Sequence, residues 1–147
     1  RSSDLGEDVS LVIGGTGEAE RELRQLTQEL SVGSAVTFEG HIPESRLAAT
    51  YKSADLFACP AWMSYGITPL EAYSMRTPVA ISEDTFVKEL LGGALGVDII
   101  EPTVDAWTTG IRSIMNRPQP KIDSQIIPTW QEFCKQKHNT LRGATDC

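Results

Sequence analysis

The sequence predicts an α/β fold in which helices cover both faces of a parallel sheet of about five strands. Its short apolar runs are continuous rather than alternating, and strands that are buried on both faces have this pattern. Segments with helical spacing of apolar residues separate these runs, so strands and helices alternate along the chain. Alternation of this kind indicates βαβ units with right-handed crossovers, stacked as a Rossmann-like three-layer sandwich.

The expected elements follow one another in regular order. Strands are expected at residues 9–13, 36–38, 56–59, 78–81 and 97–100. Helices are expected at residues 18–30, 43–53, 68–75, 84–91 and 104–115, and a sixth is expected within residues 124–141. The apolar face of the first helix comprises Ala19, Leu23, Leu26 and Leu30, and that of the second comprises Leu47, Ala48 and Tyr51. A linker-like segment, residues 116–123, precedes the last helix, which we expect to begin after Pro128 because proline suits a first helical turn.

Length and composition are those of one globular domain: 147 residues, 40% of them hydrophobic and 22% charged. The net charge of −7 argues against a nucleic acid or an anionic membrane as the main partner. No apolar run approaches the roughly 20 residues that span a bilayer, and we expect a cytoplasmic location. Cys59, Cys134 and Cys147 are odd in number and far apart, so we interpret them as free thiols rather than disulfide or metal ligands.

The loops that follow the strands are the candidate binding sites, because ligands of such sheets bind beyond the carboxyl ends of the strands. In the first loop, Gly15 and Thr16 lie in a glycine-rich turn whose amides suit a phosphate at a helix N-terminus. Its spacing matches neither the dinucleotide fingerprint nor the P-loop, so a turn that simply requires glycine is at least as good an interpretation. In the second loop, the backbone at His41 and Ile42 is placed to face a base edge, and we favour a solvated His41 over a catalytic one.

The third loop, residues 60–68, is the most informative. Gly66 leads into a helix that has Pro69 in its first turn. The amides expected to face an incoming anion there belong to Tyr65, Gly66, Ile67 and Thr68. Glu71 follows one turn later, and its carboxylate suits the two vicinal hydroxyls of a ribose, which need an acceptor. The alternative is that Glu71 only complements the helix dipole, and the residues alone favour the two equally.

The stretch from Gly66 through Glu71 to Ala72 resembles the signature of the retaining GT-B glycosyltransferases, the group 1 family of glycogen-synthase-like and mannosyltransferase-like enzymes. Other segments resemble that family in the same order. They are residues 11–17 and 36–40, the stretch containing Tyr51, Ala54, Asp55, Leu56 and Pro60, the triplet at 77–79, Ser82, Glu89, and Trp130 near the start of the family's closing helix. The resemblance covers about residues 9 to 140.

The resemblance implies half of a GT-B fold and a function in hexosyl transfer with retention. Residues 1–147 would form a single nucleotide-sugar-binding domain, truncated at its N-terminal edge, with residues 123–141 as a C-terminal closing helix. Glu71 would bind the ribose hydroxyls, the amides around Gly66 and Ile67 the diphosphate, and His41 and Ile42 would lie near the base. The resemblance also implies a nucleotide-diphosphate sugar as the donor substrate and no requirement for a metal or other cofactor.

Three departures from the family pattern bear on activity. Met63 stands where the family usually has a first glutamate that contacts the transferred sugar, so we assign no catalytic residue. Arg76 replaces a glycine before the Pro-Val strand, where a side chain would either fill the crevice or change the helix end. The family's Arg and Lys that neutralise the diphosphate belong to a segment before residue 1, as does the N-terminal acceptor domain. We therefore expect the isolated chain to lack transfer activity and to need that domain or another partner half.

Two further hypotheses stand beside the donor-binding one. Met63 and Arg76 would also fit a degenerate, non-catalytic member that binds a nucleotide or a partner. An unrelated Rossmann-like module that binds another nucleotide or a phosphosugar has the same predicted fold, since fold alone does not determine function.

Overall fold

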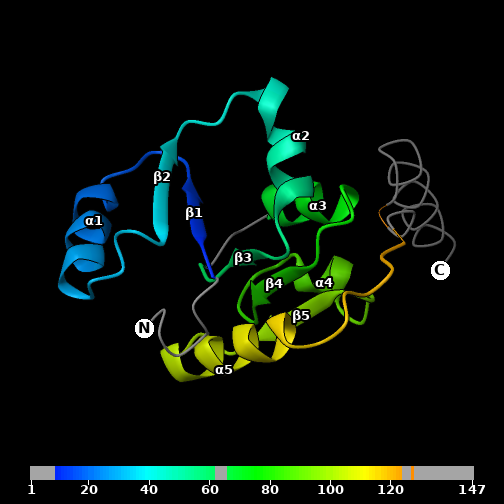
Figure 1. Ribbon diagram of the computed structural model, residues 1–147. Coiled ribbons are helices and arrows are strands. Elements are labelled where there is room, and N and C mark those ends of the chain that lie inside the picture. The colour runs from blue at the N-terminus through cyan, green and yellow to red at the C-terminus, as the bar shows by residue number, and fades with distance from the viewer. Residues whose placement is uncertain (1–8, 62–65, 124–126, 128–147) are drawn as a thin grey trace, which may run out of the picture. The chain divides into compact units, whose positions relative to one another are not determined.

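The computed structural model describes residues 9–61, 66–123 and 127, and its fold is α/β with parallel strand pairing in the described part (Figure 1). The chain divides into two compact units, Arg1–Leu47 and Ala48–Cys147. Among the described residues, the first unit holds a two-stranded sheet and the second a three-stranded sheet. The predicted fold class is confirmed, with the five expected strands hydrogen-bonded as a pair and as a set of three.

The first unit pairs β1 (Leu11–Gly14) with β2 (Val36–Gly40), and α1 (Glu20–Glu29) connects them. The guanidinium of Arg24 lies 4.3 Å from the centroid of the Phe38 ring, so α1 packs against β2. The predicted apolar face of α1 is not buried, because Leu23, Leu26 and Leu30 are 39%, 46% and 49% exposed. Two strands and one helix provide too little surface to enclose that face within this unit.

The second unit orders its strands β3-β4-β5, and all its strand pairs are parallel. The strands are β3 (Phe57–Cys59), β4 (Val79–Ser82) and β5 (Val97–Ile100). The helices are α3 (Ile67–Ser74), α4 (Lys88–Leu91) and α5 (Val104–Met115), while α2 (Glu44–Ser53) spans the boundary between the units. α4 is shorter than predicted, because the residues before it form successive tight turns, with amides of Thr85 and Lys88 bonded to carbonyls three residues back.

Helices cover both faces of the second sheet, with α3 on one side and α5 on the other (Figure 1). Val79, Ala80 and Ile81 of β4 are fully buried. Ala80 packs with Ile100 and with Ile114 of α5, and strand alternation directs Val79 and Ile81 to the opposite face. Cys59 is buried as predicted.

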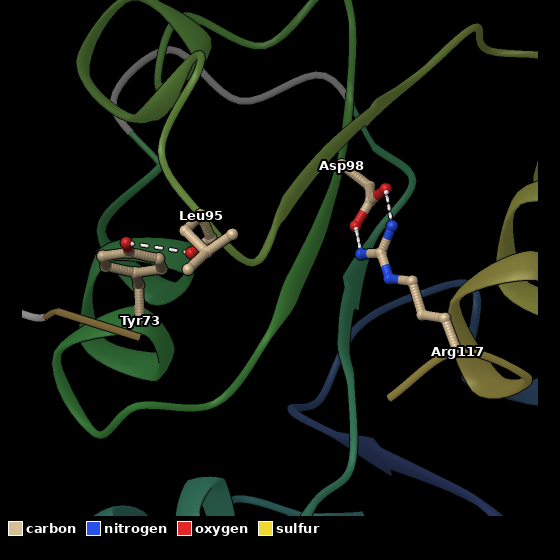
Figure 2. Close-up of polar contacts among 4 residues, drawn as sticks. All are labelled: Tyr73, Leu95, Asp98 and Arg117. Atoms are coloured by element: carbon tan, nitrogen blue, oxygen red, sulfur yellow. Dashed lines mark hydrogen bonds and ion pairs between the residues drawn. The ribbon is translucent and has the colours of Figure 1, made fainter. Parts of the chain in front are cut away.

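The linker-like segment after α5 contains no helix or strand, as predicted, yet it packs on the second unit. Arg117 forms a bidentate ion pair with Asp98 of β5, with Nη1 donating to Oδ1 at 3.0 Å and Nη2 to Oδ2 (Figure 2). Ile122 is buried against Gly96, where an added Cβ would lie 2.8 Å from its Cγ1. The predicted helix at residues 124–141 and Trp130 lie outside the described residues. In the ranges that are described, no helix is long and apolar enough to cross a membrane.

Candidate functional site

The candidate site of the second unit begins at Gly66, which is the N-cap of α3. Gly66 adopts the left-handed conformation, with φ 62° and ψ 47°. A Cβ at this position would lie 2.7 Å from the Cβ of Val87, closer than carbon atoms approach. Glycine is therefore required twice here, once for the backbone dihedrals and once for the close packing against Val87.

At the N-terminus of α3, the first helical residue is exposed while the N-cap Gly66 is buried. The helix begins at Ile67, one residue earlier than predicted, and Ile67 is 62% exposed. The first bond of the helix runs from the amide of Leu70 to the carbonyl of Gly66, at 3.5 Å. The amide of Ile67 lies before this first bond of the helix, so it has no acceptor within the helix. Thr68, the next residue, is half-buried, and Pro69 has no amide hydrogen. The positive end of the helix dipole thus lies at Gly66 and Ile67, and a helix N-terminus of this kind favours an anion.

Glu71 lies beyond the first turn of α3, which contains no acidic residue. Because the favourable effect of the dipole on a carboxylate falls off within that first turn, it is a weak explanation for Glu71. The residue is half-buried, and its Oε2 accepts a hydrogen bond from the hydroxyl of Tyr51 at 3.0 Å. Glu71 is therefore a partly buried, oriented carboxylate one turn away from the helix N-terminus.

Tyr51 is held in place by its ring and by its backbone. Its ring packs edge-on against Phe57, with centroids 5.6 Å apart, and the residue is only 7% exposed. Its carbonyl accepts a hydrogen bond from the buried hydroxyl of Thr77 at 2.7 Å. Burial, then the hydrogen bond to Glu71 and its negative charge, raise the pKa of Tyr51 from 10.0 to about 12. The hydroxyl thus stays protonated and acts as a donor at neutral pH.

This contact was not predicted, because Tyr51 was interpreted as part of an apolar helix face and of the stretch that resembles the family, with no role at the site. The signal available was chemical: a buried tyrosine hydroxyl needs a hydrogen-bond partner, and a carboxylate predicted in the next helix was a candidate acceptor. Of the three residues predicted for that face, Leu47 is half-buried, Ala48 is exposed and Tyr51 is buried.

The C-terminus of α3 forms a Schellman motif with Arg76 in the left-handed position, at φ 67°. The amide of Thr77 donates to the carbonyl of Ala72 at 3.1 Å, and that of Arg76 to the carbonyl of Tyr73 at 2.9 Å. The helix end therefore keeps its usual form although arginine replaces glycine. Arg76 is exposed, so its side chain does not fill a crevice.

The glycine turn after β1 contacts the loop after β2 within the first unit. Gly15 has φ 106°, and its amide donates to the carbonyl of Gly40 at 2.6 Å. The Thr16 side chain also lies near Gly40, because a Cβ added to Gly40 would be 4.0 Å from Thr16 Cγ2. The interpretation as a turn that requires glycine is confirmed for Gly15, and the phosphate role of this turn stays a prediction.

The loop after β2 presents His41 to solvent and turns Ile42 inward. A Cβ on Gly14 would lie 2.7 Å from Ile42 Cδ1, so a side chain at position 14 would displace Ile42. His41 is exposed, as favoured from the sequence. Two predicted positions of the third loop, Met63 and Tyr65, lie outside the described residues.

Comparisons with known proteins agree on one family. The family model for glycosyl transferases group 1 matches residues 2–129. D-inositol 3-phosphate glycosyltransferase of Nocardia farcinica is 33% identical over 114 residues, which cover 71% of this chain and 25% of that protein. The GDP-mannose-dependent alpha-(1-6)-phosphatidylinositol monomannoside mannosyltransferase of Mycolicibacterium smegmatis is 30% identical over 121 residues, which cover 76% of this chain and 32% of that protein. The chain thus spans only 25% to 32% of the length of these relatives.

Solved structures share the fold at lower identity. Sucrose-phosphate synthase from Thermosynechococcus elongatus superposes with a TM-score of 0.74 and 22% identity, over 92% of this chain and 38% of that chain. Anabaena HepE in complex with UDP and glucose gives a TM-score of 0.72 and 20% identity, over 94% of this chain and 41% of that chain.

Proposed function

The chain belongs to the glycosyl transferases group 1 family, and from this we propose that it is the nucleotide-sugar donor-binding portion of a glycosyltransferase that transfers a hexosyl group with retention. Membership excludes the hypothesis of an unrelated Rossmann-like module. Because the chain spans about a quarter of the length of relatives such as the Nocardia farcinica enzyme, we also propose that transfer requires the rest of such a protein.

The start of α3 carries this proposal. A helix N-terminus whose first residue, Ile67, is exposed and whose N-cap, Gly66, has a conformation that only glycine adopts readily suits the diphosphate of a donor. One turn further, the Glu71 carboxylate is half-buried and oriented by Tyr51, which suits the two ribose hydroxyls of the same donor. The two features lie in one helix, one turn apart, so a single donor bound along α3 would meet both.

Charge on the leaving group is the chemical problem that this site would address. In transfer, the acceptor hydroxyl oxygen bonds to the anomeric carbon, the bond from that carbon to the diphosphate oxygen breaks with its electron pair staying on the diphosphate, and the acceptor's proton passes to the leaving diphosphate. Amides and the dipole at the N-terminus of α3 would stabilise that charge, and they need no reorganisation during the reaction. Glu71 would hold the nucleoside so that the diphosphate stays on the helix axis.

The remaining positions are proposed on the resemblance. Tyr65 would add a backbone amide to the diphosphate site, and Gly15 with Thr16 would form a second phosphate contact. His41 and Ile42 would contact the base. We further propose that residues 1–147 act as one nucleotide-sugar-binding domain and that residues 123–141 supply its closing helix.

The base is left open by the comparisons. The mannosyltransferase of Mycolicibacterium smegmatis is named as GDP-mannose-dependent, whereas HepE was solved with UDP and glucose. Titration calorimetry with UDP, GDP and ADP and with their sugars is therefore the direct test. We expect one nucleoside diphosphate to bind, and we expect no multiple-turnover transfer by the chain alone. The proposal is refuted if none of these ligands binds, either to the chain alone or to the chain supplied with an acceptor half.

A second candidate function, a non-catalytic nucleotide- or partner-binding member, is favoured by Met63. A thioether is only a weak acceptor for sugar hydroxyls, so the usual contact to the transferred sugar would be lost. Met63→Glu in a two-domain protein, with an acceptor half supplied, tests this. Transfer that appears only with the variant supports the non-catalytic function, and transfer by the unaltered chain in that context excludes it.

A further inference from the structure

We propose that Tyr51 is a positioning residue for Glu71: its hydroxyl fixes one carboxylate oxygen and leaves the other directed at the ribose of the donor. This inference rests on the proposed function, in which Glu71 binds the ribose hydroxyls. It adds a residue on a different helix, α2, which would contact no ligand atom itself.

The first step is the contact itself. The Tyr51 hydroxyl donates to Oε2 of Glu71 at 3.0 Å. Within the described part of the chain, it is the one hydrogen-bond donor to this carboxylate. A glutamate side chain has several torsions and populates many rotamers when it has no partner, so a single well-placed donor decides where its oxygens point.

The second step is that Tyr51 is itself immobilised from two other elements. Its ring packs edge-on against Phe57 of β3, and its carbonyl accepts from Thr77 in the turn that follows α3. That turn is closed by the bond from the Thr77 amide to the carbonyl of Ala72 in α3. Because Tyr51 is tied to the strand before α3 and to the turn after it, its hydroxyl has a fixed position relative to Glu71.

The third step concerns the lone pairs of the Glu71 carboxylate that the Tyr51 hydroxyl does not occupy. A carboxylate offers about four lone-pair sites, and one tyrosine hydroxyl occupies only one of them. Oε1 and the other lone pair of Oε2 remain for a vicinal diol. The Tyr51 hydroxyl is protonated at neutral pH, and its one hydrogen is donated to Oε2, so it takes no donor away from the ribose hydroxyls.

The alternative is that Tyr51 is merely structural, a buried tyrosine that has found a partner for its hydroxyl. The chain offers a matched control for that case in Tyr73. This tyrosine is 1% exposed, lies in α3 like Glu71, and donates its hydroxyl to the carbonyl of Leu95 at 3.2 Å (Figure 2). Its bond does not involve Glu71.

The experiment compares ribose preference in Tyr51→Phe, Tyr73→Phe and the unaltered chain. Each protein is titrated with the nucleoside diphosphate that binds and with its 2′,3′-dideoxy analogue, which lacks the diol. We expect Tyr51→Phe to weaken ribonucleotide binding by roughly threefold to tenfold, the scale of one hydrogen bond, and to leave dideoxynucleotide binding unchanged. Tyr73→Phe is expected to leave both affinities unchanged.

A second variant keeps the inference testable in case Tyr51→Phe is poorly folded. Thr77→Val removes the hydrogen bond that the Thr77 hydroxyl donates to the Tyr51 carbonyl at 2.7 Å, so it loosens Tyr51 while the side chains of Tyr51 and Glu71 stay unaltered. We expect it to reduce ribose preference in the same direction as Tyr51→Phe, by a smaller factor, and an unchanged ribose preference in this variant would count against the positioning role.

The outcomes separate this inference from the proposed function. If the unaltered chain binds the dideoxy analogue as tightly as the ribonucleotide, Glu71 does not read the ribose and the proposed role of the site fails. In the other case, the chain prefers the ribonucleotide, while Tyr51→Phe keeps that preference or weakens the binding of both ligands by the same factor. The positioning role of Tyr51 is then overturned, and the ribose role of Glu71 stands.

Discussion

Replacing Arg76 by glycine is expected to stabilise the protein, because Arg76 occupies a backbone position that suits glycine. It is the left-handed residue of the Schellman motif that ends α3, with φ 67°. Its side chain is exposed and forms no hydrogen bond or ion pair with other described residues. The substitution therefore removes backbone strain and very little else.

The size of the gain follows from two opposing terms. A non-glycine residue in the left-handed region costs roughly 1–2 kcal/mol. Glycine gives back about 0.4–1 kcal/mol of this, because it makes the unfolded chain more flexible. Taken at their midpoints, the two terms leave a net stabilisation of about 0.8 kcal/mol, which corresponds to a rise in Tm of about 2–3 °C for a chain of this size.

Urea and thermal unfolding, followed by circular dichroism, measure this difference. Arg76→Ala is the matched control, since it removes the same side chain but keeps a Cβ and hence the strain. A second site gives an independent repeat: Ser31 follows α1 with φ 54°, and the amides of Ser31 and Val32 close the same motif onto Gln28 and Thr27 at 3.0 Å each. The reasoning is refuted if Arg76→Gly is no more stable than Arg76→Ala.

Four other predictions test the site and its support. Glu71→Ala is expected to weaken nucleotide affinity by about 1–3 kcal/mol in titration calorimetry, and an unchanged affinity would exclude the ribose role. Gly66→Ala is expected to destabilise the chain by about 1–3 kcal/mol in urea, because it adds strain and overlaps Val87, and a loss below about 0.5 kcal/mol would contradict this. Thr77→Val removes the buried hydroxyl that donates to the Tyr51 carbonyl and keeps nearly the same side-chain volume. It is expected to lower the free energy of unfolding by about 1 kcal/mol in urea, and an unchanged free energy would mean that this hydrogen bond does not stabilise the fold. The raised pKa of Tyr51 adds stability that is complete below pH 10 and is lost as the pH rises toward about 12, so Tyr51→Phe should lose less stability over that window than the unaltered chain; an equal loss would argue against the shift.

The elements that could be predicted well are those whose signals are local. β5 and α5 lie at the predicted residues, Val97–Ile100 and Val104–Met115. The strand is a continuous apolar run that follows Gly96, and the helix has a capping residue, Thr103, whose side chain accepts from the amide of Ala106 at 3.2 Å. Periodicity and capping at such positions need no knowledge of the tertiary structure.

Other features depend on contacts that no local pattern contains. α4 was predicted to begin at residue 84, but Thr85 is in a turn and its hydroxyl donates to the carbonyl of Ala61 at 3.2 Å. The apolar spacing of α1 predicted a buried face, and Leu26 in that face is 46% exposed. Which strands form ladders with one another is likewise decided by tertiary packing, so the division into a pair and a set of three was not predicted.

The candidate site divides in the same way. Gly66 was found from the sequence because a glycine before a helix with Pro69 in its first turn is a local signal, and the N-cap lies there. Tyr51 was not found, since its contact with Glu71 spans 20 positions and joins two helices. A residue that acts through another side chain has no motif of its own.

The surroundings of Glu71 favour a ligand over a purely structural role for this carboxylate. A glutamate that only complements the dipole of α3 would be expected in the first turn and in full contact with water, but Glu71 lies beyond that turn and is half-buried. Removing part of a charged group from water is costly unless hydrogen bonds replace the lost solvent. Among the described residues, Tyr51 supplies one such bond, to Oε2, which leaves acceptor capacity unused. A diol that approaches along α3 would supply the missing donors, and the cost of keeping this carboxylate half-buried is explained if binding such a diol is its function.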